Sequence, residues 1–126
     1  GDRGEAQAVR FLKRIGYKIV ARSHRSLLGE LDIVAVDLRD PRGSTVVFVE
    51  VKTRSSHDAG HPAEAIDADK QRRLTNLAHT YRRRFQLTEH PARFDVVAIT
   101  WPAGDKKPQI EHYINAFESF GTDLQD

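Results

Sequence analysis

The sequence predicts an α/β fold, in which a mixed sheet is flanked by helices in a single domain over residues 1–126. Apolar residues recur at helical spacing in two separate segments, and short blocks of β-branched residues fill the stretches around them. These blocks follow one another as helix, three strands, helix and two strands. A chain of 126 residues is long enough for one real core and too short for two.

The first helix and three strands are expected in the first half of the chain. Apolar residues repeat at helical spacing through residues 2–15, and Gly16 follows as a stop signal. Strands are then expected where β-formers alternate or run together, at residues 17–23, 31–38 and 45–51. Turn formers fill residues 40–44, so we expect the last two of these strands to form a hairpin.

The second half predicts a long helix and two more strands. The helix is expected at residues 67–85, where the apolar side chains fall along one stripe: Leu74, Leu77, Ala78, Tyr81 and Phe85. Residues 94–101 form a run that predicts a buried strand. After a turn region containing proline and glycine, residues 109–114 predict a further strand.

The composition excludes several classes of chemistry. Without cysteine the chain has no disulfide, thiol nucleophile or cysteine-ligated zinc, so a bound metal would need oxygen or imidazole ligands. No Gly-x-Ser-x-Gly elbow or Gly-rich phosphate loop supports acyl transfer or nucleotide hydrolysis. No apolar run approaches the roughly 20 residues of a membrane span and no secretion signal is visible, so we expect a cytoplasmic protein without membrane contact.

The charge pattern is compatible with a polyanionic partner. The formal net charge is +2 and the pI is about 9.1, with basic clusters in or near both expected helices. Arg72 and Arg73 lie near the start of the long helix, and with Lys70 they are candidate nucleic-acid contacts. Solvated helix faces show the same clusters, and a lysine such as Lys70 can instead snorkel along an apolar stripe, so both interpretations stay open.

Charged residues interrupt strands that otherwise read as buried. Asp32 lies within one apolar strand, and Glu50 and Lys52 flank Val51 near the end of another. Residues two apart in a strand project from the same face, so Glu50 and Lys52 should lie side by side. A hairpin turning about Arg42 would place Asp32 opposite Lys52 and diagonal to Glu50. Two carboxylates and one ammonium group would then share one patch.

Such a patch suits a metal-dependent reaction on phosphate. Asp32 and Glu50 would offer oxygen ligands to Mg²⁺ or Mn²⁺, which relieves the repulsion between the acids. Lys52 would orient the attacking water or help to deprotonate it, and the chemistry would be phosphodiester hydrolysis. The alternative is a structural ion-pair cluster in which Lys52 neutralises both acids.

The same residues resemble a known nuclease signature. Residues 29–35, GELDIVA, and 48–54, FVEVKTR, resemble the P-D-x(n)-(D/E)-x-K motif, with Leu-Asp in place of Pro-Asp. Further elements are Arg3-Gly4-Glu5, Lys70, Arg93-Phe94-Asp95-Val96-Val97 and Asn115-Ala116-Phe117. Together they are similar to the bacterial YraN family, also called UPF0102, whose fold is related to archaeal Holliday junction resolvases.

The resemblance implies a fold, a site and a partner. The fold would be a restriction-endonuclease-like core of the order α-β-β-β-α-β(-β). Asp32 and Glu50 would bind the metal, Lys52 would serve the water, and Glu5 of the first helix would complete the catalytic set. The substrate would be DNA, with branched or damaged DNA as candidates, and a resolvase-like enzyme would act as a homodimer. The alternative function is a non-catalytic nucleic-acid-binding module that retains the nuclease fold.

Further polar residues have two interpretations each. Glu5 fits a capping box in the first helical turn, yet it also lies on the inward stripe of Val9 and Leu12. Glu30 should share a strand face with Asp32 and could join the metal site or face solvent. His57 and His61 have the spacing of helical metal ligands, but they lie in an expected loop and we assign them no role. Asp95 also interrupts a buried strand, where Arg93 could pair with it.

Overall fold

The expected order of elements is confirmed by a computed structural model that describes residues 2–41, 43–55, 66–104 and 107–118. The described residues form two helices and five strands: α1 (Asp2–Arg14), β1 (Tyr17–Ser26), β2 (Gly29–Asp37), β3 (Thr45–Ser55), α2 (Ala68–Arg84), β4 (Ala92–Trp101) and β5 (Gln109–Phe117). Several strands extend beyond their expected ends, because backbone pairing continues through polar positions that apolar patterning does not mark. No described helix combines the length and apolar character needed to cross a bilayer.

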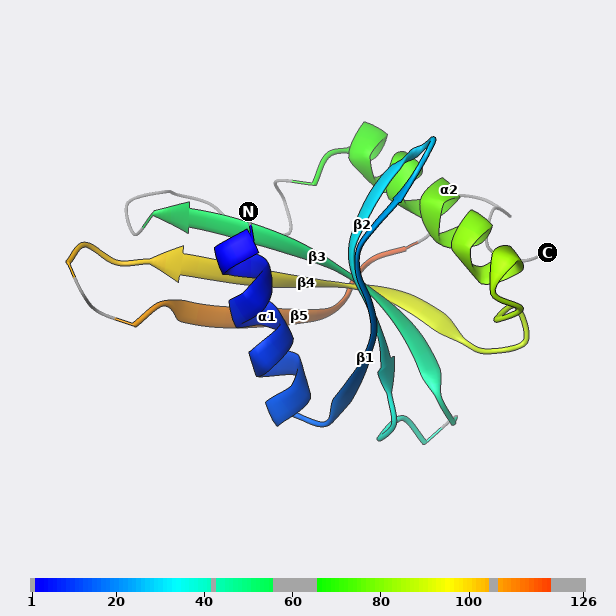
Figure 1. Cartoon of the computed structure of the whole chain (residues 1–126), viewed down its shortest axis with the longest axis horizontal. Coiled ribbons are helices and arrows are strands. Elements are labelled where there is room, and N and C mark those ends of the chain that lie inside the picture. The colour runs from blue at the N-terminus through cyan, green and yellow to red at the C-terminus, as the bar shows by residue number, and fades with distance from the viewer. Residues whose placement is uncertain (1, 42, 56–65, 105–106, 119–126) are drawn as a thin grey trace.

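The strands form one mixed sheet in the order β1-β2-β3-β4-β5 (Figure 1). β3 and β4 are parallel, and the other neighbours are antiparallel. A parallel pair needs a crossover connection, and α2 supplies it between β3 and β4. This explains why the long helix interrupts the run of strands in the sequence.

The two helices cover opposite faces of the sheet. Alternate residues of β3 divide between two cores: Val46 and Phe48 belong to the core under α2, and Val47 and Val49 belong to the core under α1. β3 is therefore buried on both faces, as its continuous apolar run predicts. The result is an α/β fold with a five-stranded mixed sheet between helices, compatible with a restriction-endonuclease-like core.

The register expected for the β2–β3 hairpin is wrong by two residues. Val34 pairs with Phe48, and Ile33 pairs with Val49, so the turn is not centred on Arg42. Continuing this register places Asp32 opposite Glu50, where Lys52 was expected. A shift of two residues keeps every side chain on its expected face, because the side-chain period of a strand is two. The acids therefore still meet, although their cross-strand partners change.

The β1–β2 hairpin reaches across to α2, and its tip lies beside that helix (Figure 1). The ring of His24 in β1 makes an edge contact with Tyr81 of α2, with ring centroids 5.0 Å apart. Leu31 of β2 is buried in the core under α2. The outer part of this hairpin is thus fixed against the long helix, and Glu30 and Asp32 lie in this part of β2.

Arg93 organises a buried ion network at the other end of β2. Its guanidinium donates to Asp95 at 3.0 Å, to Asp37 at 3.1 Å and to the Tyr17 hydroxyl at 2.6 Å. Burial pushes the pKa of Asp95 upwards, but hydrogen bonds with His112 and Arg93 hold it below its ordinary value. The expected pairing of Asp95 with Arg93 is therefore observed, and this buried acid is neutralised within the fold.

Candidate metal centre

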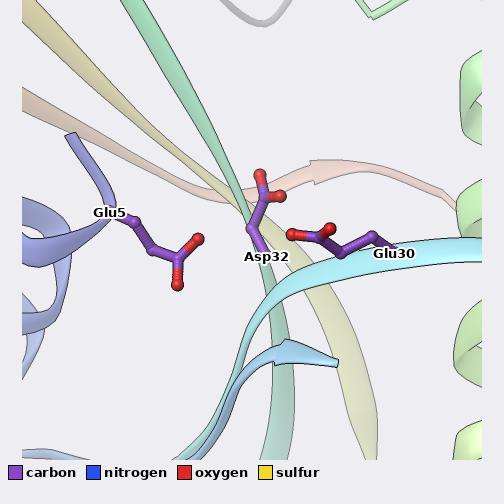
Figure 2. A group of neighbouring side chains, drawn as sticks. All are labelled: Glu5, Glu30 and Asp32. Carbon is purple, nitrogen blue, oxygen red and sulfur yellow. The ribbon is translucent and has the colours of Figure 1, made fainter. Parts of the chain in front are cut away.

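Three carboxylates from two distant segments meet beside the β1–β2 hairpin (Figure 2). Glu5 comes from α1, whereas Glu30 and Asp32 come from β2 and are two residues apart on that strand. One oxygen of each carboxylate lies within 4.8 Å of the others. Glu5 and Glu30 flank Asp32 in Figure 2, so of the two positions open for Glu30 the one beside the other acids is observed.

Glu5 is held in place by β1. Its side chain is buried, as the inward stripe of α1 predicts, and both its carboxylate oxygens lie near the Ser23 hydroxyl, at 2.8 and 3.0 Å. Arg22 lies 3.6 Å from the same carboxylate. Next to Glu5, the Cα of Gly4 lies so near Thr53 of β3 that any Cβ would collide with the Thr53 methyl group. The absence of a side chain at Gly4 allows α1 to approach the sheet and bring Glu5 to Asp32.

Asp32 is crowded by acids and lacks a paired cation. One of its oxygens accepts a hydrogen bond from the Val51 amide at 2.9 Å, and the carboxyl group of Glu50 adjoins it. It makes no ion pair with any described residue. Burial and the charge of Glu50 raise the pKa of Asp32 to about 7, although the Val51 amide and Lys70 act in the opposite direction.

Glu50 is neutralised by a lysine from the long helix. Its side chain is only 7% exposed, and the Lys70 ammonium lies 3.1 Å from it. Lys52 shares the strand face of Glu50 but makes no ion pair within the described part of the chain. The lysine that contacts the acids is thus Lys70, which the sequence placed among the nucleic-acid contacts.

The donor set suits a hard divalent cation. Asp32 belongs to the group with Glu5 and Glu30, and it also adjoins Glu50, which lies outside that group. Mg²⁺ and Mn²⁺ take oxygen ligands and need only one or two carboxylates from the protein. The residues present therefore fit such an ion, and Asp32 would be its central ligand.

The candidate nucleic-acid cations differ in their surroundings. Arg72 pairs with Asp69 at 3.1 Å on the exposed side of α2. Arg73 is exposed and lines a groove together with Lys70, Glu30 and Asp32. Of the three candidate nucleic-acid contacts, Arg73 is thus the exposed one that lies next to the acids.

Sequence reasoning did not find Ser23. Its φ of 47° is in the left-handed region, which non-glycine residues adopt mainly under tertiary constraint. It lies between Arg22, which pairs with Ile33, and His24, which pairs with Leu31. Ser23 ends the strand expected at residues 17–23, but no residue pattern marks its contact with Glu5. His57 and His61, which were assigned no role, lie outside the described residues.

A larger hollow of about 670 Å³ lies at the β2–β3 turn, away from the four acids. Its lining includes Asp37, Arg39 and Arg93. These charges pair with one another, since Asp37 contacts both arginines. The hollow therefore belongs to the structural ion network, and the acids near Asp32 remain the better candidate for chemistry.

The α/β class, the five-stranded mixed sheet and its two flanking helices are compatible with a restriction-endonuclease-like core. The family model described as "Uncharacterised protein family UPF0102" matches residues 4–99, and the chain belongs to this family. It is 44% identical over 124 residues to a UPF0102 protein of Rhodopirellula baltica, covering 98% of this chain and 72% of that protein. It is 46% identical over 118 residues to a UPF0102 protein of Geobacter metallireducens, covering 94% and 91% respectively.

Proposed function

We propose that the protein is a metal-dependent endonuclease that hydrolyses DNA phosphodiesters, with branched or damaged DNA among its substrates. The observation that carries this proposal is the position of Asp32, a partly buried carboxylate beside Glu5, Glu30 and Glu50 without an ion pair among the described residues. An arrangement of this kind destabilises a fold unless something binds it. A divalent cation supplies the missing positive charge.

Four carboxylates would share the task of holding the ion. Asp32 is the central ligand. The carboxylates of Glu5 and Glu30 lie together with that of Asp32, and the carboxyl group of Glu50 adjoins Asp32 separately. When bound, Mg²⁺ or Mn²⁺ offsets negative charge on the phosphate and on the leaving oxygen. Ser23 holds Glu5 ready by its hydrogen bonds, which reduces the ordering that binding requires.

The two lysines receive different roles. Lys70 neutralises Glu50 in the metal-free protein and lies close enough to lower the pKa of Asp32. Lys52 projects from the strand face of Glu50 and completes the (D/E)-x-K pattern, so we propose that its ammonium group orients the attacking water. The water oxygen bonds to phosphorus and gives up a proton to solvent, the bond from phosphorus to the leaving oxygen breaks, and that oxygen takes up a proton from solvent.

A cleavage assay tests the proposal. Purified protein is incubated with end-labelled duplex, nicked, branched and single-stranded DNA, in Mg²⁺, in Mn²⁺ and in a chelator. We expect cutting with either metal, none in chelator, and a loss on the order of 100-fold or more in Asp32→Asn and Glu50→Gln. Asp69→Asn is the matched control, because Asp69 lies on α2 with its side chain 90% exposed.

Two results would overturn nuclease activity. Cutting that persists in Asp32→Asn and Glu50→Gln would point to a contaminating enzyme. DNA binding that is salt-sensitive, independent of metal and never followed by cutting would favour the non-catalytic binding module. Sedimentation of the protein with and without DNA would test the expected homodimer.

A further inference from the structure

Two adjacent leucines project from the tip of the β1–β2 hairpin. Leu27 is fully exposed and Leu28 is 52% exposed. Single exposed leucines are ordinary on protein surfaces. Two together at a hairpin tip are a different feature, because such an apolar edge tends to be used in binding.

The tip is fixed in position. The Ser26 hydroxyl accepts a hydrogen bond from the Leu28 amide at 3.3 Å, and β1 pairs with β2 as far as Ser26 and Gly29. Gly29, with a φ of 138°, adopts a conformation that favours glycine, and a Cβ at this position would lie 3.5 Å from the Leu77 side chain of α2. With the contact of His24 on Tyr81, these interactions place the two leucines at the end of a hairpin that packs against α2.

A groove of about 310 Å³ connects this edge to the metal centre. Leu28 and Leu77 contribute an apolar wall, and Glu30 and Asp32 lie in the same lining. Lys70 and Arg73 also line the groove, from the side of α2. An apolar surface, two cations and the candidate metal ligands thus border one continuous space.

This combination matches one nucleotide and its phosphates. Apolar side chains that enter a base step unstack it, and bases pack against apolar side chains when they leave the duplex. Arg73, which is exposed and lines the groove, offers positive charge to a phosphate, whereas Lys70 in the same lining pairs with Glu50.

We propose that Leu27 and Leu28 form a wedge that unstacks DNA beside the scissile phosphate, and that the groove receives the displaced nucleotide. This inference rests on the proposed function of the metal centre and names its substrate class. The substrate is DNA whose bases are already unpaired or easily separated at the cut, as at a branch, flap or mismatch. Separating such bases costs less than separating a regular base pair, so the wedge makes the site selective.

The test uses Leu27→Ser/Leu28→Ser in the full chain. Leu38→Ser is the matched control, since Leu38 is also exposed but follows β2 at the other hairpin. Branched and regular duplexes carry 2-aminopurine beside the expected cut, and Ca²⁺ replaces Mn²⁺ as an oxygen-liganded probe. We expect wild type and Leu38→Ser to raise the fluorescence of the branched DNA on binding, whereas the double variant leaves it unchanged.

Cleavage in Mn²⁺ gives the second readout. The preference for branched over regular duplex should fall on the order of tenfold in the double variant, from the loss of two apolar contacts with bases. Equal fluorescence and equal preference in the double variant and wild type would overturn the wedge while leaving the nuclease intact. Tip-dependent unstacking without cutting by any form would support the wedge and overturn the nuclease. A change in oligomeric state of the double variant on sedimentation would show a self-association surface and overturn the wedge.

Discussion

Replacing Asp32 by Asn should stabilise the metal-free protein and abolish its stabilisation by metal. The first effect follows from the carboxyl group's surroundings, because burial and Glu50 disfavour its ionised form. The folded protein holds the proton on Asp32 more tightly than the unfolded chain does. The free energy of unfolding of the wild type should therefore fall as pH rises from about 4 to about 7, and Asp32→Asn should remove this component.

The magnitude follows from the same pKa. A pKa of about 7 in place of 3.8 sets an upper bound of about 4 kcal/mol on the free energy by which ionised Asp32 destabilises the folded protein above neutral pH. Asp32 is only partly buried, and solvent screening reduces the penalty to about 1–2 kcal/mol. For a chain of 126 residues, about 4 °C of Tm corresponds to each kcal/mol, so Asp32→Asn should gain about 4–8 °C near pH 8.

Adding Mn²⁺ should reverse the order of stability. A ligand at a hundredfold excess over its Kd stabilises the folded state by about 2.7 kcal/mol, which corresponds to about 10 °C for the wild type. Asp32→Asn should not respond, so the wild type becomes the more stable protein in metal. The assay is thermal unfolding followed by circular dichroism at several pH values, with Asp69→Asn as control. Equal responses to Mn²⁺ in wild type and Asp32→Asn would refute a metal centre at this position. A wild-type stability that rises, relative to the variant, between about pH 5 and 8 would refute the raised pKa of Asp32.

The remaining predictions concern residues that position the site or support the fold. Gly4→Ala should destabilise the protein by about 1–3 kcal/mol and weaken Mn²⁺ binding measured by calorimetry, because the alanine Cβ would meet the methyl group of Thr53. Adding Thr53→Ser, which lacks this methyl group, should restore both the stability and the Mn²⁺ affinity. Failure of that rescue would refute the steric cause. Ser23→Ala should lower the free energy of unfolding by about 1 kcal/mol and reduce Mn²⁺ affinity, because the hydrogen bonds to Glu5 are lost. An unchanged Mn²⁺ affinity would mean that Glu5 is not a metal ligand. Arg93→Met should lower the free energy of unfolding measured in urea by about 3–5 kcal/mol, because it leaves buried acids unpaired. The Mn²⁺ affinity of the folded variant should stay at the wild-type value. A small loss of stability would show that the ion network contributes little.

Most of the fold could be predicted from the sequence, because periodic burial leaves a direct record in the residue pattern. β3 illustrates this, since both its faces are covered by helices and its residues are apolar almost without interruption. The same pattern indicated Asp32 and Glu50, which stand out as charges inside such runs. The family resemblance added Glu5, whose burial confirms its inward orientation.

The contacts within the candidate site were less predictable. The sequence placed Lys52 opposite Asp32, but hairpin register depends on turn geometry around residues 40–44, where several lengths of turn are compatible with the same residues. The ion pair of Glu50 with Lys70 depends on how α2 packs across the sheet, and apolar spacing along the helix does not specify that. The contact of Ser23 with Glu5 was missed because it depends on how α1 packs against β1, which strand patterning does not specify.

The two groups of buried acids in this fold show why function should be sought near Asp32. Asp95 is completely buried, yet Arg93 and His112 contact it and its pKa lies below the ordinary value. Asp32 is less deeply buried, but it adjoins Glu50 without an ion pair in the described part of the chain, and its pKa is raised. A fold that needed only to tolerate acids in its sheet would neutralise both in the same way. The protein supplies its own cation at Asp95, whereas Asp32 has no ion pair among the described residues. If the proposed metal centre is correct, a metal titration should therefore perturb the surroundings of Asp32 and leave those of Asp95 unchanged.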